Sequence, residues 1–190
     1  MQEKALTMMD VLFPRASLAR DALLILSFGI VTALCAQIAF WIGLVPITGQ
    51  TFAVLLAGAL LGSKRGALSQ LTYLGSGALG APVFAGWTGG IAHFIGPTGG
   101  YLLGFVAAAF VVGFLAERGW DRRFWSVALA LLAGNAVIYL FGLPWLANFV
   151  PTNSVLSVGL YPFIPGDLIK LFLVAIALPS GWALLNRFGR

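Results

Sequence analysis

Long uncharged apolar stretches constrain this chain more than any other feature of its sequence. Residues 22–45 contain no Asp, Glu, Lys or Arg. A helix that crosses a bilayer needs roughly 20 apolar residues, with a working range of about 17 to 25. Only 9% of the 190 residues are charged, against about 25% in a soluble domain. The chain is therefore predicted to be an integral membrane protein, and soluble globular and disordered folds are excluded.

The charge balance excludes the function class that a basic chain usually suggests. Eleven Lys and Arg against six Asp and Glu give a net charge of +5, but basic residues scattered through an apolar chain form no phosphate-binding face. Nucleic-acid binding is therefore excluded, and the excess of Lys and Arg instead predicts cytoplasmic segments of a membrane protein. The single cysteine, Cys35, excludes an intramolecular disulfide framework and a thiolate metal site.

Glycines, prolines and charged residues divide the chain into six apolar stretches, which predicts an all-α membrane protein with six transmembrane helices. The second and third stretches are near the lower length limit, and we expect them to form a tight hairpin around Lys64 and Arg65. Pro144 predicts a bend in the fifth helix and Pro179 a kink in the sixth. The predicted spans are residues 22–45, 46–61, 67–81, 101–116, 124–146 and 167–185.

Six crossings place ten of the eleven basic residues on one side of the membrane. The loops on the other side, about residues 46–50, 82–100 and 147–165, contain no Lys or Arg. Because an excess of Lys and Arg marks the cytoplasmic side, both termini are predicted to be cytoplasmic. The ten residues are Lys4, Arg15, Arg20, Lys64, Arg65, Arg118, Arg122, Arg123, Arg187 and Arg190.

Three segments follow from this pattern: a cytoplasmic N-terminal segment at 1–20, a transmembrane domain at 21–186 and a cytoplasmic tail at 187–190. Glu3 and Asp10 lie in the N-terminal segment, which argues against a cleaved signal peptide. This segment is predicted to be either a short amphipathic helix on the inner membrane surface or a partly ordered tail.

Asp167 and Lys170 are the one acidic and the one basic residue that these segments leave outside the cytoplasm. They lie three residues apart at the start of the sixth span, so on a helix they share a face about one turn apart. An ionisable residue below the membrane interface faces the bundle interior or a cavity and is a candidate functional residue. The pair offers an acceptor and several donors side by side, which suits a neutral group that carries both N–H and C=O. The alternative is a salt bridge that only orients the sixth helix.

The predicted outer loops and the fifth span supply the other candidates for a pocket. The glycine-rich loop at 82–100 is predicted to cover an apolar pocket, and an aromatic belt at the membrane interface is the alternative for any single residue. Asn135 is predicted to hold helices together, with pocket lining as the alternative, whereas Tyr139, on the same helix face, is predicted to line the pocket. His93 is predicted to be a packing residue. The polar cluster of Thr48, Gln50 and Thr51 is predicted either to line the mouth of a cavity or to cap the second span. The remaining pocket candidates are Thr48, Gln50, Phe84, Trp87 and Tyr101.

Four blocks of sequence resemble the signature blocks of BioY, the biotin-specific S component of energy-coupling factor (ECF) transporters. They occur in the family's order, and the resemblance extends over roughly residues 21–186. The blocks are PITGQTFAVLLAG at 46–58, GALGAPVFAG at 77–86, GPTGGYLLGF at 96–105 and PGDLIK at 165–170.

The resemblance implies a six-helix, S-component-like bundle in the bacterial cytoplasmic (inner) membrane, with an outward-facing pocket that captures biotin for uptake. In the family, the Asp and Lys of the last block contact the bicyclic end of biotin, and they match Asp167 and Lys170. The valeryl tail is then expected on apolar loop surface, with its carboxylate near the mouth. The implied partners are a transmembrane coupling protein and a pair of cytoplasmic ATPases. The chain itself is expected to be no enzyme and to need no cofactor.

S components usually dock on their coupling protein through small residues at a four-residue spacing on the first helix. The pairs available here are Gly29 with Ala33 and Thr32 with Ala36. Three alternatives stay open: an S component for another vitamin, a homo-oligomeric biotin carrier that works alone, and a purely structural membrane protein. An intramembrane enzyme that uses the charge pair as acid and base lacks a nucleophile, a metal set and a second carboxylate in this sequence.

Overall fold

The protein is mostly helical in its computed structural model, which describes residues 7–14, 17–41 and 43–188. This agrees with the predicted fold class. Two short strands interrupt the helices after the first long one. In chain order the elements are α1 (Met8–Leu12), α2 (Leu18–Ala36), β1 (Ala39–Phe40), β2 (Ile47–Thr48), α3 (Gln50–Leu61), α4 (Ser63–Ala78), α5 (Ala92–Ile95), α6 (Gly99–Ala116), α7 (Phe124–Leu146), the 3-10 helix η1 (Thr152–Ser154), α8 (Val155–Gly159) and α9 (Ile164–Phe188).

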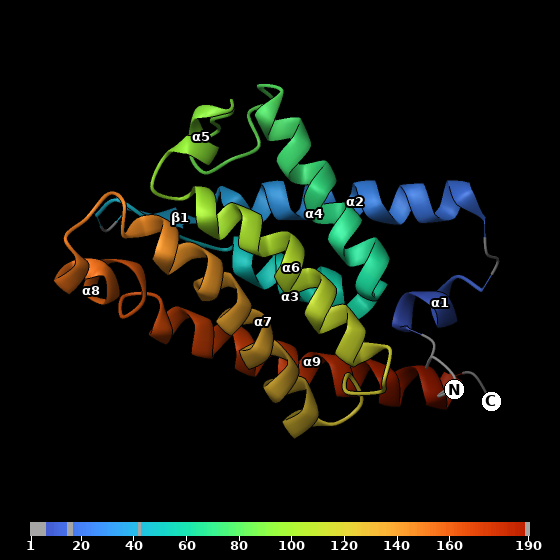
Figure 1. Cartoon of the computed structure of the whole chain (residues 1–190). Coiled ribbons are helices and arrows are strands. Elements are labelled where there is room, and N and C mark those ends of the chain that lie inside the picture. The colour runs from blue at the N-terminus through green and yellow to red at the C-terminus, as the bar shows by residue number, and fades with distance from the viewer. Residues whose placement is uncertain (1–6, 15–16, 42, 189–190) are drawn as a thin grey trace.

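The long helices form one bundle in which α3 lies between α2 and α9, and α6 packs on α3, α4 and α7 (Figure 1). Glycine allows α3 and α6 to meet backbone to backbone. A Cβ at Gly58 would lie 2.4 Å from the carbonyl oxygen of Ala109, and a Cβ at Gly113 would lie 2.3 Å from the carbonyl carbon of Gly62. Small residues that permit such close approach are typical of helix packing in membranes.

Four helices are long and apolar enough to cross a membrane, namely α2, α6, α7 and α9. Helix α3 is apolar but has only 12 residues, and α4 has 16. These two correspond to the predicted second and third spans. A single residue, Gly62, separates them, and its φ of +85° is in the region that favours glycine. Pro144 and Pro179 lie inside the continuous helices α7 and α9. The described residues therefore support four spans, and the six-span topology stays a prediction.

The first long helix is shorter than predicted, and this part of the prediction is wrong. Helix α2 ends at Ala36, and the antiparallel hairpin β1–β2 follows where the prediction extended the helix. Gln37 fixes the break, because its Nε2 donates to the carbonyl oxygen of Phe84 at 3.1 Å and its Oε1 accepts from the backbone N–H of Trp87 at 2.9 Å. An apolar sequence was therefore compatible with a hairpin that a distant loop stabilises.

The N-terminal segment contains a short helix, α1, which begins with a capping box formed by Thr7 and Asp10. Met8 is buried, and its methyl carbon lies 3.0 Å from the position that a Cβ at Gly181 of α9 would take. Part of this segment thus forms the helix that was one of its two predicted forms. Residues 1–6, 15 and 16 of the segment lie outside the described part of the chain.

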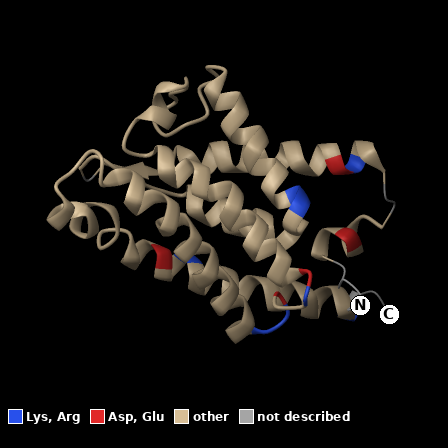
Figure 2. Cartoon of the chain, viewed as in Figure 1, with Lys and Arg blue, Asp and Glu red and all other residues tan. Residues whose placement is uncertain are grey.

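Most of the charged residues lie at one end of the bundle, near α1 and the C-terminal end of α9 (Figure 2). Arg65 of α4 approaches Asp10 to 2.8 Å and Asp21 to 3.2 Å, and Arg20 approaches the same carboxylates to 3.1 and 2.8 Å. We call these four residues the terminal charge network. Burial raises the pKa of the Asp10 carboxyl, but hydrogen bonds from Thr7 and Arg65 outweigh it, so the pKa lies below its ordinary value.

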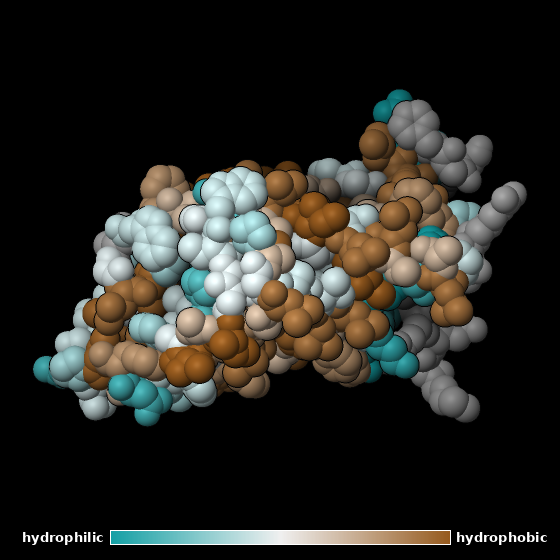
Figure 3. Space-filling model, turned by 90° about the horizontal axis from the view of Figure 1, so that it is seen from above, coloured by the Kyte–Doolittle hydropathy of each residue, from teal (hydrophilic) through white to brown (hydrophobic). Residues whose placement is uncertain are grey.

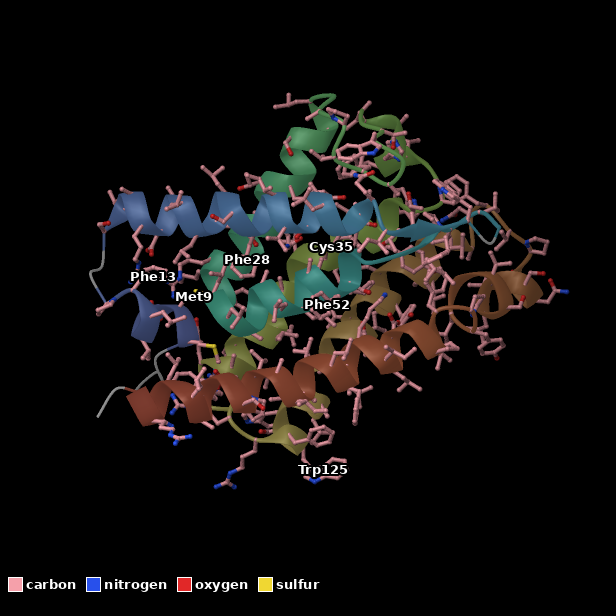
Figure 4. The ribbon with its side chains drawn as sticks, turned by 180° about the vertical axis from the view of Figure 1, so that it is seen from behind. Met9, Phe13, Phe28, Cys35, Phe52 and Trp125 are labelled. Carbon is pink, nitrogen blue, oxygen red and sulfur yellow. The ribbon has the colours of Figure 1, made fainter. Side chains whose placement is uncertain are left out.

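Apolar side chains also cover much of the protein's outer surface, as the brown areas seen from above show (Figure 3). The apolar stretch of α2 is only 11% buried within the chain. Trp125 at the start of α7 points away from the bundle, whereas Phe28 of α2 is buried (Figure 4). Large contiguous apolar surfaces mark contact with lipid or a partner. The exposed apolar residues of α2 include Leu23, Leu26, Ile30 and Leu34.

Candidate ligand-binding site

The charge pair, Asp167 and Lys170, lies in the first turns of α9, with Lys170 Nζ 3.4 Å from Asp167 Oδ1. Lys170 also donates at 2.8 Å to the carbonyl oxygen of Thr48 and at 2.8 Å to the hydroxyl of Thr51. Three acceptors thus surround an ammonium group that has three N–H donors. The predicted sharing of one helix face is confirmed, and the amine is held among polar groups inside an apolar bundle.

The Asp167 carboxylate links three helices. The Tyr139 hydroxyl of α7 donates to its Oδ2, and the Thr51 hydroxyl of α3 donates to its Oδ1 at 3.4 Å. The residue is only 8% exposed. A buried carboxylate is stabilised when several donors share its lone pairs. The pair is therefore part of a polar cluster that joins α3, α7 and α9, and is more than an isolated salt bridge on one helix.

A narrow cavity of about 50 Å³ adjoins this cluster. We call it the inner cavity. Lys170 and Tyr139 reach its wall, whereas Asp167 is not among its lining residues. Most of the remaining wall is apolar. The lining residues are Val45, Pro46, Thr48, Gln50, Thr51, Thr98, Tyr101, Leu102, Phe105, Asn135, Ile138, Tyr139, Phe163 and Lys170.

A wider cavity of about 290 Å³, the outer cavity, adjoins the inner one, since Pro46, Gln50, Thr98 and Leu102 line both. The hairpin β1–β2, the loop before α5 and α5 itself form its wall, and none of the described residues that line it is Asp, Glu, Lys or Arg. Binding pockets for small molecules are mostly apolar, with few polar groups that fix orientation. The lining residues are Trp41, Leu44, Pro46, Gln50, Phe84, Ala85, Ala92, His93, Gly96, Pro97, Thr98 and Leu102.

Phe84 is the aromatic anchor of the outer cavity. It is 2% exposed and stands edge-on to the Tyr73 ring, with centroids 5.5 Å apart. Its ring occupies the space beside Gly77 of α4, where a Cβ would lie only 2.2 Å away. The loop that carries Phe84 is thereby fixed to α4. His93 packs against the same ring at a centroid distance of 5.0 Å, so the packing role predicted for it agrees with its position.

Three of the predicted polar residues, Thr48, Gln50 and Tyr101, make hydrogen bonds within the protein, so they shape the cavity walls more than they offer free groups to a ligand. The Thr48 hydroxyl donates to Gln50 Oε1 at 2.7 Å, and Gln50 Nε2 donates to the Tyr73 hydroxyl at 2.6 Å. Tyr101 donates to the carbonyl oxygen of Gly159 at 2.9 Å. The protein itself thus satisfies these donors, and their side chains form a firm wall around the cavities.

Trp87 and Asp167 are the two predicted site residues that line neither cavity. Trp87 is 65% exposed and has a positive φ of 58°, which is uncommon for a residue other than glycine. Thr51 and Asn135 line the inner cavity, which was one of the two alternatives predicted for each. Phe163 lines it as well and was not predicted, because no pattern in the sequence marks it.

The small residues proposed for partner docking face the interior of the chain. Gly29, Thr32 and Ala36 of α2 are buried, and a Cβ at Gly29 would lie 3.3 Å from the Ser69 carbonyl oxygen of α4. Ala33 is half-buried. These residues pack α2 on α4, so the face of α2 open to lipid or a partner is the opposite, leucine-rich one. Docking through the small residues stays a prediction.

The described residues contain no group of three or more His, Cys, Asp or Glu that would hold a metal ion. The site is instead a hydrogen-bonding cluster at the narrow end of an apolar pocket. Its features fit the reversible binding of a small organic molecule.

A bundle of apolar helices that encloses such a pocket defines a multi-pass membrane protein with a small-molecule binding site. The family model described as the BioY family matches residues 3–187. The chain therefore belongs to the BioY family, and the resemblance seen in the sequence is confirmed.

Relatives and a solved structure support the assignment. The chain is 48% identical over 152 residues to the probable biotin transporter BioY of Pyrococcus horikoshii, covering 80% of this chain and 90% of that one. It is 44% identical to the biotin transporter BioY of Thermotoga maritima, covering 78% and 89%. The crystal structure of an S-component for biotin from an ECF-type ABC transporter matches with a TM-score of 0.76 at 29% identity, covering 85% of this chain and 90% of the other.

Proposed function

We propose that the protein captures biotin and takes it up across the cytoplasmic membrane as the substrate-binding subunit of an ECF-type transporter. The observation that carries the proposal is the Lys170 amine in the wall of the inner cavity, where no other lining residue in the described part of the chain is charged. Membership of the BioY family and relatives named as biotin transporters support it. As a transporter subunit, the protein binds and releases its ligand unchanged and is not an enzyme.

Biotin's ureido ring fits the inner cavity by its chemistry. Its carbonyl oxygen accepts from the Lys170 amine, through the N–H that otherwise makes only the long 3.4 Å contact to Asp167. The Asp167 carboxylate, which lies behind the cavity wall, accepts from Tyr139 and holds Tyr139 and Lys170 in place. The apolar valeryl tail lies along the outer cavity under Phe84, where it removes apolar surface from water. The carboxylate of biotin lies at the mouth, beyond the uncharged wall.

The topology and partners complete the proposal. Six helices cross the membrane, with α3 and α4 as the two short ones, and both termini and the terminal charge network are cytoplasmic. A transmembrane coupling protein and a pair of ATPases supply the energy. The exposed apolar face of α2 is the surface available to the coupling protein.

Equilibrium binding tests the function directly. Purified protein in detergent is titrated with radiolabelled biotin, with unlabelled biotin, thiamine and riboflavin as competitors. We expect saturable binding in the nanomolar to micromolar range that only biotin displaces. Displacement by another vitamin would favour an S component for that vitamin, and absence of saturable biotin binding would refute the proposal. Co-purification of coupling protein and ATPases distinguishes an ECF subunit from a carrier that works alone.

A further inference from the structure

Asn135 of α7 carries a buried amide that the protein leaves without a hydrogen bond. The residue is 8% exposed, and its Oδ1 has no partner. Among the residues that the structure describes, none bonds its Nδ2 either. Because a 180° rotation about the Cβ–Cγ bond exchanges the positions of the amide oxygen and nitrogen, both the acceptor and the donors of the amide are available to a ligand. Unsatisfied polar groups in an apolar bundle are unfavourable and call for an explanation.

Other buried polar side chains show that this state is unusual for the chain. Gln70 and Asp121 each have one buried oxygen without a partner. However, Gln70 Nε2 donates to Thr32 and Ser69, and Asp121 Oδ2 accepts from Trp182 Nε1 at 2.6 Å. These two side chains connect elements of the protein. The Asn135 amide makes no such connection within the described residues, which argues against the helix-packing role that the sequence predicts for it.

The position of Asn135 indicates what its amide is for. Asn135, Ile138 and Tyr139 all line the inner cavity, and their spacing of three and four residues places them on one face of α7. Lys170 lines the same cavity from α9. An unpartnered amide therefore stands one helical turn from Tyr139, in a space whose other polar lining groups are largely bonded to one another.

We infer that Asn135 is a ligand-binding residue that hydrogen-bonds the ureido ring of the vitamin. This inference rests on the proposed function. An amide has a carbonyl acceptor and N–H donors, which complement the N–H and C=O of a cyclic urea. Binding satisfies a group that is unsatisfied in the empty protein, so Asn135 favours the occupied state and discriminates against ligands without a ureido ring.

Substitution Asn135→Leu tests the inference, because Leu has a similar volume and no polar atom. We expect the affinity for biotin to fall by roughly tenfold. Desthiobiotin, which keeps the ureido ring, should lose the same factor. The melting temperature of the ligand-free protein should stay equal or rise, because the variant removes a buried unsatisfied group. A helix-packing role predicts the opposite pattern: a lower melting temperature with unchanged affinity.

Two further variants keep the outcome clear. Asn135→Ala removes the same amide and should also weaken biotin binding, and it takes the place of Asn135→Leu if that variant folds poorly. Gln70→Leu is the matched control, because it removes a buried amide on α4 that lines neither cavity; it should lower the melting temperature and leave the affinity unchanged. Wild-type affinity in both Asn135 variants would overturn the inference while the proposed function stands. Failure of the wild-type protein to bind biotin would overturn both.

Discussion

The two ends of the bundle use their charges differently. In the terminal charge network, Arg20 and Arg65 each pair with both Asp10 and Asp21, so every charge has opposite charges beside it. At the other end, Lys170 has one carboxylate at 3.4 Å, and its shorter contacts go to a carbonyl and a hydroxyl oxygen. Both arrangements border a cavity, but in the first each of the four charges is paired twice, whereas Lys170 is the one charged residue, among those the structure describes, in the wall of the inner cavity.

This difference separates residues that stabilise the fold from residues that bind. Ion pairs that are partly open to solvent contribute modestly and can be replaced with limited effect. A charged group in the wall of the narrow inner cavity is different, because its interaction with a ligand takes place away from water. Matched substitutions are therefore expected to act on different quantities. A change in the terminal charge network should lower the stability of the fold, whereas a change at Lys170 should lower the affinity for the ligand.

Substitution of Lys170 should have the largest effect on binding. In Lys170→Met, the amine that donates to the ligand is lost while the length of the side chain is kept. We expect roughly a thirty- to hundredfold loss of biotin affinity, equivalent to about 2–3 kcal/mol for hydrogen bonds from a charged group. Titration with labelled biotin measures it. A variant that binds like the wild type would show that the charge pair only orients α9.

The matched change at the other end is Arg65→Met. It removes the contacts to Asp10 and Asp21 and should lower the free energy of unfolding by about 1 kcal/mol, because these carboxylates are partly exposed. Thermal melting followed by circular dichroism measures this effect. Biotin affinity should not change. Weaker binding in this variant would mean that the two ends are coupled, and the comparison would then fail.

The smallest expected effect is on acid stability. The ordinary pKa of an Asp carboxyl is 3.8, and in the folded protein the pKa of Asp10 is lower. The ionised carboxylate therefore stabilises the fold fully at pH values above 3.8. This stabilisation is lost as the pH falls through the lowered pKa. We expect Asp10→Asn to melt lower than the wild type at neutral pH and the difference to shrink in strong acid. A difference that grows with acidity would contradict the sign.

Much of the site was predictable because single residues carried the signal. Asp167 and Lys170 were conspicuous since the rest of the outer half is uncharged, and Tyr139 follows from helical spacing on α7. Which groups face the ligand was not predictable. The Asp167 carboxylate lies behind the cavity wall and Asn135 lies in it, and this depends on how three helices are rotated against one another.

The fold shows the same limit. Apolar length alone predicted α7 at residues 124–146, and the structure has Phe124–Leu146. The end of α2 was missed because a loop about fifty positions further along supplies the partners of Gln37. Local sequence patterns carry no information on contacts between such distant residues, so the prediction placed the end of this helix too far along the chain.

The shortness of α3 has a consequence for the depth at which the ligand is held. At 1.5 Å per residue, its 12 residues rise only about 18 Å, whereas the hydrocarbon layer is about 30 Å thick. In the proposed six-span topology, one end of α3 therefore lies within the membrane, where exposed backbone needs partners. Lys170 supplies one at the carbonyl of Thr48, two residues before α3 begins. In this topology the vitamin leaves its hydration shell partway across the bilayer, where polar groups of the protein take the place of solvent.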